Sequence, residues 1–298
     1  MKKCLAFVLG GGGARGALEV GALRALLEAG FQPDLLVGTS IGAVNAVGLA
    51  LWGVNIAGIE RLERAYRNLT ASRLMDPRLI RFAALGVLSG RPDQYISRRA
   101  EQLFIAEGIT PDLRFSQFPD VRLGLVSSDV DSGETVIYGA NPEQSILQGL
   151  MASIALPFWF APVERDGHYL IDGGALSNLP IESALRLGAT EIIALDLNDP
   201  GWLIGTGNGR GQYLEKLLFA MTQRQVFMEM ELASARNVPV RYVSLRSSTG
   251  VPIWDFRTHR DLFKAGYEIM QQKISGWRRD RPQNWFFDLF KPRKIKLS

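Results

Sequence analysis

Cysteine and histidine are nearly absent from this chain of 298 residues. The single cysteine, Cys4, cannot form an intrachain disulfide, so nothing in the sequence requires an oxidising compartment. With only two histidines beside it, the chain offers few ligands for a zinc site. Internal repeats and low-complexity tracts are also lacking, and charged residues make up 21% of the chain against 47% hydrophobic ones. This composition excludes a disordered, repetitive or disulfide-rich protein and predicts a globular protein with a large core.

Two apolar segments imitate targeting or membrane signals. The first follows two lysines, but it is only about six residues long and ends in glycines, so we interpret it as a buried strand and not as a signal peptide. The second, residues 35–59, has no ionisable residue and is long enough to span a bilayer. Its glycines and asparagines favour the other interpretation, which is a buried strand, a tight turn and a buried helix. We therefore expect a cytoplasmic protein.

The C-terminal segment, residues 277–298, carries seven cationic side chains and two anionic ones, interleaved with aromatic residues. The formal net charge of the whole chain is +4, so the remainder is close to neutral. Such a segment could rest on an anionic membrane surface, and peripheral membrane contact is one expectation. The alternative is that its aromatic side chains pack on the body of the protein while its charges stay in water. No basic stripe or binding motif elsewhere indicates nucleic acid as a partner.

Apolar runs alternate with amphipathic stretches along the chain, which predicts alternating strands and helices. Strands are expected at residues 3–9, 35–37, 122–127, 135–138, 169–171, 191–197 and 241–245, and helices at 16–28, 41–51, 56–69, 94–106, 142–151, 180–187, 212–235 and 260–277. The β-α-β-α start predicts a three-layer α/β/α sandwich with a mainly parallel central sheet.

The expected organisation has three parts. Residues 1–200 form the core that carries the site, residues 201–276 complete the same domain, and residues 277–298 form the basic aromatic tail. Residues 199–211 contain five glycines and are expected to form a long loop, either a lid over a site or a mobile surface connection.

Glycines gather directly after the first expected strand, in LGGGGARGALEVG, Leu9–Gly21. A loop of this kind that opens a helix points backbone N–H groups at an anion. Gly11, Gly13 and Gly16 have the spacing of a dinucleotide-binding fingerprint, but that site needs an acidic residue at the end of the second strand, and none is there. A P-loop would need a lysine after Gly16, which is also missing. We therefore expect no nucleotide cofactor, and an oxyanion formed in a transition state remains as the anion.

A candidate nucleophile follows the second expected strand. Gly38-Thr39-Ser40-Ile41-Gly42 matches G-x-S-x-G between a strand and a helix, where a sharp turn exposes the serine hydroxyl. A serine nucleophile needs a base. The two histidines, His168 and His259, are candidates, and so is Asp172, which with Gly173 and Gly174 ends another apolar run.

In this order, the three motifs resemble those of the patatin-like phospholipases, and Ala152–Pro157 resembles a further block of that family. Asn178 and Pro180 fit the pattern around the aspartate, and the resemblance covers about residues 3–200. It implies a patatin-like α/β/α fold and metal-independent hydrolysis of carboxylic esters of lipids, with phospholipid or lysophospholipid as the substrate class and no cofactor.

The resemblance also implies a role for each motif. Ser40 is the expected nucleophile and Asp172 the expected general base of a Ser-Asp dyad. The expected oxyanion hole comprises the amides of Gly11, Gly12 and Gly13, with Arg15 shaping that loop, and the motifs are supported by Gly38, Gly42, Gly173 and Gly174. His168 becomes a structural or surface residue.

An aspartate is a weak base for a serine hydroxyl, so a dyad needs an apolar setting that raises the pKa of the carboxyl. Phe158, Trp159 and Phe160 could form such a wall, line an acyl pocket or simply pack in the core. Residues 129–133 begin like a calcium loop, but the twelfth position is Ala140 where an EF-hand needs glutamate. We therefore expect a turn there and no metal.

The rival to a hydrolase is a catalytically idle module on the same fold, which binds lipid or protein and docks to membranes through its tail. The presence of both Ser40 and Asp172 favours the enzyme.

Overall fold

The computed structural model describes residues 3–75, 94–157, 159–198, 210–247 and 250–279. Its centre is one mixed sheet, hydrogen-bonded in the order β5-β6-β3-β2-β1-β7-β8, with β4 also paired to β3. The strands are β1 (Leu5–Leu9), β2 (Leu35–Thr39), β3 (Arg122–Asp129), β4 (Thr135–Tyr138), β5 (Val163–Arg165), β6 (His168–Asp172), β7 (Glu191–Asp196) and β8 (Val240–Ser244). Strands β3, β2, β1, β7 and β8 run parallel, whereas β4, β5 and β6 join by antiparallel pairing.

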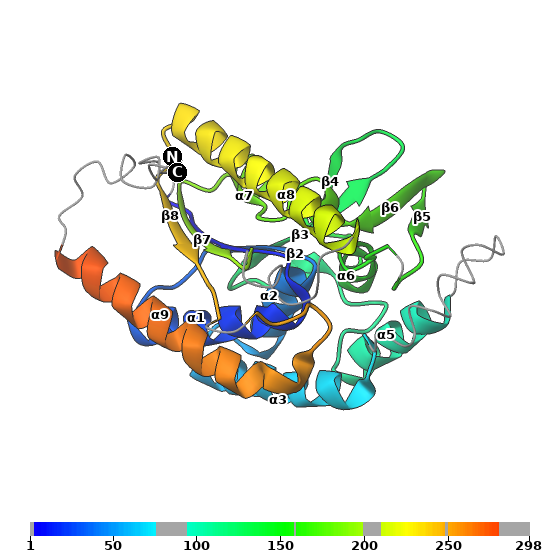
Figure 1. Ribbon diagram of the computed structural model, residues 1–298, viewed down its shortest axis with the longest axis horizontal. Helices are drawn as coiled ribbons and strands as arrows, with labels where there is room; N and C mark the ends of the chain where they lie inside the picture. Colours follow the sequence, from blue (N-terminus) through cyan, green and yellow to red (C-terminus); the bar gives the residue numbers. More distant parts are fainter. Residues whose placement is uncertain (1–2, 76–93, 158, 199–209, 248–249, 280–298) are drawn as a thin grey trace.

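Helices cover both faces of this sheet (Figure 1). They are α1 (Gly16–Glu28), α2 (Ile41–Trp52), α3 (Ile56–Ser72), α5 (Gln94–Ala106), α6 (Ile146–Ser153), α7 (Ile181–Arg186), α8 (Arg210–Ala235) and α9 (His259–Arg279). Helices α7 and α8 pack on one face, over alternate side chains of β1 such as Ala6 and Val8. The larger core on the other face takes Phe7 and Leu9 together with α1, α2, α3 and α9. The expected three-layer α/β/α sandwich with a mainly parallel sheet is therefore confirmed.

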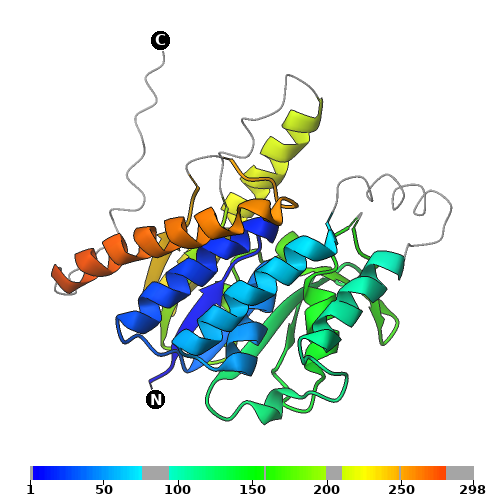
Figure 2. The same cartoon turned by 90° about the horizontal axis from the view of Figure 1, so that it is seen from below.

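Two glycines let α1 and α9 lie against each other along the outer layer (Figure 2). A Cβ atom at Gly21 would meet the Phe263 carbonyl oxygen at 1.9 Å, and one at Gly266 would meet the Leu18 carbonyl oxygen at 1.9 Å. Because no side chain separates the two backbones at these points, α9 is held closely on α1. This contact joins the C-terminal part of the described chain to the helix that follows the glycine loop.

The structure decides between the alternatives for residues 35–59. They form β2, a turn, α2 and the start of α3, and Leu36, Val47 and Leu49 are fully buried in the protein core. Within the described residues, no helix combines the length and the apolar character that crossing a bilayer demands.

Two other features differ in detail from the sequence expectations. Strand β5 was not expected, because its three residues are too few to show a periodic pattern. The expected tail begins inside α9, where Trp277 packs edge-on against Phe31 at 5.9 Å and lies under the Arg241 guanidinium at 5.2 Å. For this one aromatic residue, packing on the body is what the structure shows. Residues 280–298 lie outside the described residues, as does most of the expected loop at 199–211.

Candidate active site

Ser40 occupies the turn between β2 and α2 and has a backbone conformation that side chains rarely adopt. Its φ is 55° and its ψ is −122°. The turn is tight on both sides, since a Cβ atom at Gly38 would lie 2.4 Å from the backbone of Gly42, and one at Gly42 would lie 2.4 Å from the Leu9 carbonyl oxygen. The glycines of the G-x-S-x-G motif are therefore required by close backbone approach, and they hold the serine at the end of β2.

The Ser153 side chain stabilises this turn through hydrogen bonds, a role that the sequence did not indicate. Its buried hydroxyl accepts a hydrogen bond from the Ser40 N–H at 3.0 Å and donates one to the Val126 carbonyl oxygen at 2.6 Å. Ser153 belongs to the segment Ala152–Pro157, which the sequence analysis noted as a family block without a role for its serine. Only the three-dimensional structure shows that this segment supports the serine turn.

The end of β6 places Asp172 directly beyond the end of β2. Strand β2 pairs with β3 as far as Thr39 opposite Val126, and β6 pairs with β3 from Asp172 opposite Ser127 onward. Strand β4 overlaps both of these registers on β3, so it must occupy the opposite edge. Because a strand has only two edges, β2 and the antiparallel β6 share one of them and meet end to end. The aspartate thus reaches the serine turn although its strand runs against the parallel strands.

The Asp172 side chain is buried. Burial raises the pKa of its carboxyl to about 6, although the neighbouring Ser40 side chain and the Gly174 N–H both lower it. The Gly174 N–H donates to Oδ1 at 2.8 Å, while Oδ2 has no partner with good hydrogen-bond geometry. The Ser40 hydroxyl is therefore a neighbour of the Asp172 carboxyl, although no hydrogen bond between the two is described.

The glycine loop lies beside these two residues, and its amides are not equivalent. The Gly11 N–H donates to the Asn178 carbonyl oxygen at 2.9 Å. No hydrogen bond is described for the N–H groups of Gly12 and Gly13, which leaves them available to an oxyanion. Gly13 has a φ of 57°, and a Cβ atom there would meet the Ile253 carbonyl oxygen at 2.2 Å. Of the three amides expected to form an oxyanion hole, that of Gly11 already donates to Asn178, and the oxyanion hole itself stays a prediction.

Two side chains donate hydrogen bonds to carbonyl oxygens of this loop. The Nε of the buried Arg15 donates to the Gly12 carbonyl oxygen at 3.2 Å, and the shaping role expected of this arginine stays a prediction. Asn178 donates from its side-chain amide to the Gly11 carbonyl oxygen at 3.2 Å and accepts the Gly11 N–H with its own carbonyl. Because Asn178 follows Asp172 by six positions, the aspartate motif and the glycine loop are joined directly.

Two buried glutamates support the site, and no sequence motif indicated them. Glu19 accepts from the Gly10 N–H at 2.7 Å and from the Asn45 side chain at 2.8 Å, and burial raises its pKa well above the ordinary value. Glu229 of α8 accepts from the Ser177 hydroxyl at 2.6 Å and from the Glu182 N–H at 2.7 Å, and burial raises its pKa to about 7. One glutamate therefore supports the glycine loop and the other supports the segment after Asp172.

The histidines lie elsewhere. His168 is at the opposite end of β6 from Asp172, with Nδ1 2.8 Å from Oδ2 of Asp129, and His259 is buried with Nδ1 2.8 Å from the Phe256 carbonyl oxygen. No described interaction joins either ring to Ser40. Donor atoms of Asp129, Asp131 and His168 lie within 4.8 Å of one another, so the expectation of no metal stays untested.

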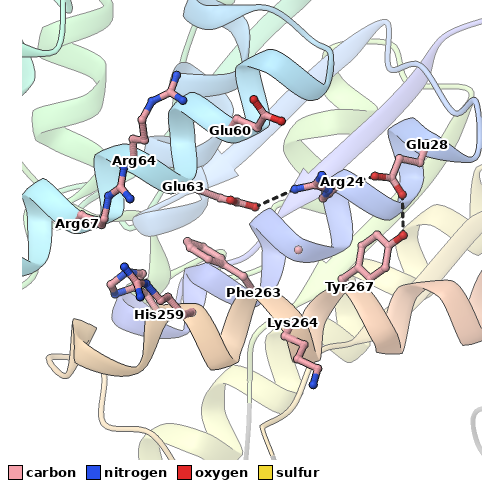
Figure 3. Close-up of a pocket in the computed structure, with 12 residues that line it drawn as sticks. Arg24, Glu28, Glu60, Glu63, Arg64, Arg67, His259, Phe263, Lys264 and Tyr267 are labelled. Atoms are coloured by element: carbon pink, nitrogen blue, oxygen red, sulfur yellow. Dashed lines mark hydrogen bonds and ion pairs between the residues drawn. The ribbon is translucent and has the colours of Figure 1, made fainter.

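Of the three expected wall residues, the two that the structure describes pack on the larger core. Phe160 is buried in the larger core, Trp159 stacks on Trp254 at 6.2 Å between ring centres, and Phe158 lies outside the described residues. A groove of about 750 Å³ runs instead along the outer helices α1, α3 and α9 (Figure 3). Charged side chains of both signs line it, and neither Ser40 nor Asp172 does.

The fold and this arrangement define a class of protein, an α/β/α sandwich with a serine on a strained strand-to-helix turn beside a buried aspartate. The model of the patatin-like phospholipase family matches residues 7–185. The chain belongs to the patatin-like phospholipase family, as its motifs predicted. That membership supports a lipid ester hydrolase.

Curated relatives match over about 200 residues. An uncharacterized NTE family protein of Mycobacterium tuberculosis is 34% identical over 199 residues, which are 65% of this chain and 49% of that protein. The human patatin-like phospholipase domain-containing protein 6 is 31% identical over 199 residues, 65% of this chain and 13% of that protein. The chain therefore matches about half or less of the length of these relatives.

Among solved structures, VipD from Legionella pneumophila is similar at 18% identity and a TM-score of 0.46, over 92% of this chain and 67% of that one. The type III effector protein ExoU is similar at 16% identity and a TM-score of 0.48, over 95% of this chain and 54% of that one. At these scores the two likenesses carry no argument about function.

Proposed function

We propose that the protein is a serine acyl hydrolase that cleaves carboxylic esters of lipids, with phospholipid or lysophospholipid as the substrate class. The observation that carries this proposal is the meeting of Ser40, on a strained turn, with the buried Asp172 carboxyl, whose pKa is raised to about 6. A carboxylate with that pKa is ionised at neutral pH and is a stronger base than an ordinary aspartate.

The first half of the proposed reaction forms an acyl-enzyme. Asp172 accepts the proton of the Ser40 hydroxyl while the serine oxygen attacks the ester carbonyl carbon. The carbonyl oxygen becomes an anion and is stabilised by the free amides of Gly12 and Gly13, at roughly 3 to 4 kcal/mol per donor. Collapse of this intermediate breaks the ester bond, and the leaving alkoxide takes the proton from Asp172.

The second half hydrolyses the acyl-enzyme. A water molecule gives a proton to Asp172 and attacks the acyl carbon, again with the anion held at the glycine loop. Collapse releases the fatty acid, and the proton returns from Asp172 to the Ser40 oxygen. Every proton is exchanged with one carboxyl, so no histidine is needed.

The test is the initial rate of hydrolysis of a soluble nitrophenyl ester, with a chelator present, for the unaltered protein, Ser40→Ala, Asp172→Asn and His168→Ala. We expect the first two variants to lose several orders of magnitude and His168→Ala to keep its rate. Equal rates for all four proteins, or the loss of activity in His168→Ala alone, would overturn the proposed chemistry. Rates at the uncatalysed background in all four proteins, with lipid binding intact, would favour the idle binding module instead.

A further inference from the structure

Helix α8 exposes an unusual amount of apolar surface. Of the nine exposed large hydrophobic side chains among the described residues, five lie on this helix: Tyr213, Leu217, Leu218, Met221 and Met228. Tyr213 is 75% exposed, and the other four are about half exposed. Scattered apolar side chains are normal on a protein surface, but a group of this kind on one helix marks an interaction site.

The spacing places most of these side chains in one stripe. Tyr213, Leu217, Met221 and Met228 follow one another at intervals of four, four and seven residues, which is the repeat of one helix face. Leu218 lies beside this stripe. The face that packs on the sheet is a different one and contains Val226, Met230 and Ala233. Helix α8 thus has two apolar faces, and among the described residues only one of them packs in the core.

The exposed stripe is fixed in position relative to the candidate active site. Gln225 donates from its side chain to the Ala175 carbonyl oxygen at 2.7 Å, and Glu229 binds the Ser177 hydroxyl, both just after Asp172. From these anchors the N-terminal half of α8 projects past the outer helices at the edge of the sheet where α1 begins (Figure 2). Met228 of the stripe therefore lies between the two anchors, and Tyr213 lies about three helical turns before Gln225.

We propose that the α8 stripe, comprising Tyr213, Leu217, Leu218, Met221 and Met228, docks the protein on the surface of a phospholipid bilayer and so holds the active site at its substrate. This inference rests on the proposed function for its purpose, but docking itself needs no catalysis. Between residues 213 and 228 the sequence has two cationic residues, Lys216 and Arg224, whose side chains are exposed, and one acidic residue, Glu215, whose side chain lies outside the described part of the chain. Cations beside an apolar helix face are the combination that binds anionic headgroups and the acyl boundary together.

A second copy of the chain is a less suitable occupant. A stable protein interface engages roughly 20 to 30 residues on each side, whereas the stripe has five apolar side chains. Glu231 follows Met228 by three positions on the same helix and is exposed, so the apolar surface ends there. A bilayer requires no matching partner surface, and a short stripe is sufficient for reversible binding.

The test measures sedimentation with vesicles of phosphatidylcholine, with and without phosphatidylglycerol, on a Ser40→Ala background so that the lipid stays intact. Leu217→Ser and Met221→Ser are compared singly and together. Ile105→Ser, which removes an exposed apolar side chain from α5, is the matched control. We expect phosphatidylglycerol to increase binding, the double variant to weaken it by about tenfold or more, and the control to leave it unchanged. Thermal unfolding of each variant shows that the fold is retained.

A second measurement locates the contact. Leu217→Cys and Ile105→Cys are each labelled with an environment-sensitive dye, while the native Cys4 is buried. Vesicles should shift the emission of the dye at position 217 to the blue and leave that at position 105 unchanged. No vesicle binding, equal binding by the double variant, or a shift at 217 that depends on protein concentration without vesicles would overturn the proposal. If the Ser40 and Asp172 variants all keep their rate of ester hydrolysis, only the proposed function is overturned, and the docking proposal is not.

Discussion

Single residues in this protein set the chemistry through their surroundings, and Asp172 is the clearest case. Its pKa is raised to about 6 because burial disfavours the charged carboxylate. The proposed mechanism uses the ionised form as the base. We therefore predict that kcat/KM for a soluble ester rises about tenfold per pH unit below a midpoint near pH 6 and is level above it.

A histidine would give a profile of similar shape, since its ordinary pKa is about 6.5. The profile is therefore recorded for His168→Ala and His259→Ala as well. Both should keep the midpoint of the unaltered protein, because neither ring interacts with Ser40 in the described structure. A profile that loses its midpoint in either histidine variant would assign the base to that histidine.

Ser153 is the residue-scale feature that sequence reasoning missed, and its role can be measured. Ser153→Ala removes the acceptor of the Ser40 N–H and leaves that amide and the Val126 carbonyl without a partner. We predict a loss of about 1 to 3 kcal/mol in the free energy of unfolding. A fall in kcat of about tenfold should accompany it as the strained turn relaxes.

Ser183→Ala is the matched control for this prediction. Ser183 is equally buried, in α7, but its hydroxyl has no described partner. Its removal should leave stability and kcat unchanged or slightly improve stability. Equal effects of the two substitutions would mean that the Ser153 hydrogen bonds do not support the serine turn.

At the scale of elements, the close contact of α1 and α9 depends on glycine. Gly266→Ala would place a Cβ atom 1.9 Å from the Leu18 carbonyl oxygen, so the two helices must move apart. We predict a loss of roughly 2 to 3 kcal/mol of unfolding free energy, measured by chemical denaturation. The same substitution at Gly276, in the same helix, meets nothing within 4 Å and should stabilise by about 0.5 to 1 kcal/mol. If both substitutions change the free energy of unfolding in the same direction, this account of the contact between α1 and α9 is wrong.

Element positions followed from hydrophobic periodicity, but their neighbours in space did not. Helix α1 begins and ends where the sequence predicts, because it starts at the last glycine of the glycine loop and apolar residues continue through it. The pairing of β6 with β3 could not be predicted, since nothing local shows that β6 is antiparallel or that it continues the edge of β2. That pairing brings Asp172 to Ser40 across 132 positions. The motifs indicated both residues, and only the sheet topology explains their meeting.

The buried glutamates that support the site could not be predicted either, because their partners are also remote in the sequence. Glu19 and Glu229 lie on helices whose patterns predict nothing unusual at those positions, and acidic side chains are ordinarily exposed. They are buried because each accepts hydrogen bonds from segments remote in the sequence. Likewise, the periodicity of α8 could not reveal which of its apolar faces the sheet would cover.

Across the whole molecule, buried acids are a common element of the site. Among the described residues, Glu19, Asp172, Asp196 and Glu229 are all buried, and burial raises the pKa of each. In the unfolded chain these carboxyls titrate near pH 4. A raised pKa in the folded state means that their stabilising contribution is complete below about pH 4 and is lost as pH rises through the folded values of about 6 and about 7.

Summed from about pH 4 to just above pH 7, this loss is roughly 3 kcal/mol for each of Asp172 and Glu229, so we predict that the folded state is most stable between about pH 4 and pH 5 and less stable at pH 8. Carboxyls with a lowered pKa, such as Asp255, make the folded state more stable as pH rises, but this stabilisation is already complete above about pH 4. Chemical denaturation across this range measures the effect, and Asp172→Asn with Glu229→Gln should flatten the curve and raise stability near pH 8. A stability that is level or rising toward pH 8 in the unaltered protein would show that these carboxyls ionise without a penalty. Asp172 would then lack the raised basicity that the proposed dyad requires, so this equilibrium measurement also tests the mechanism.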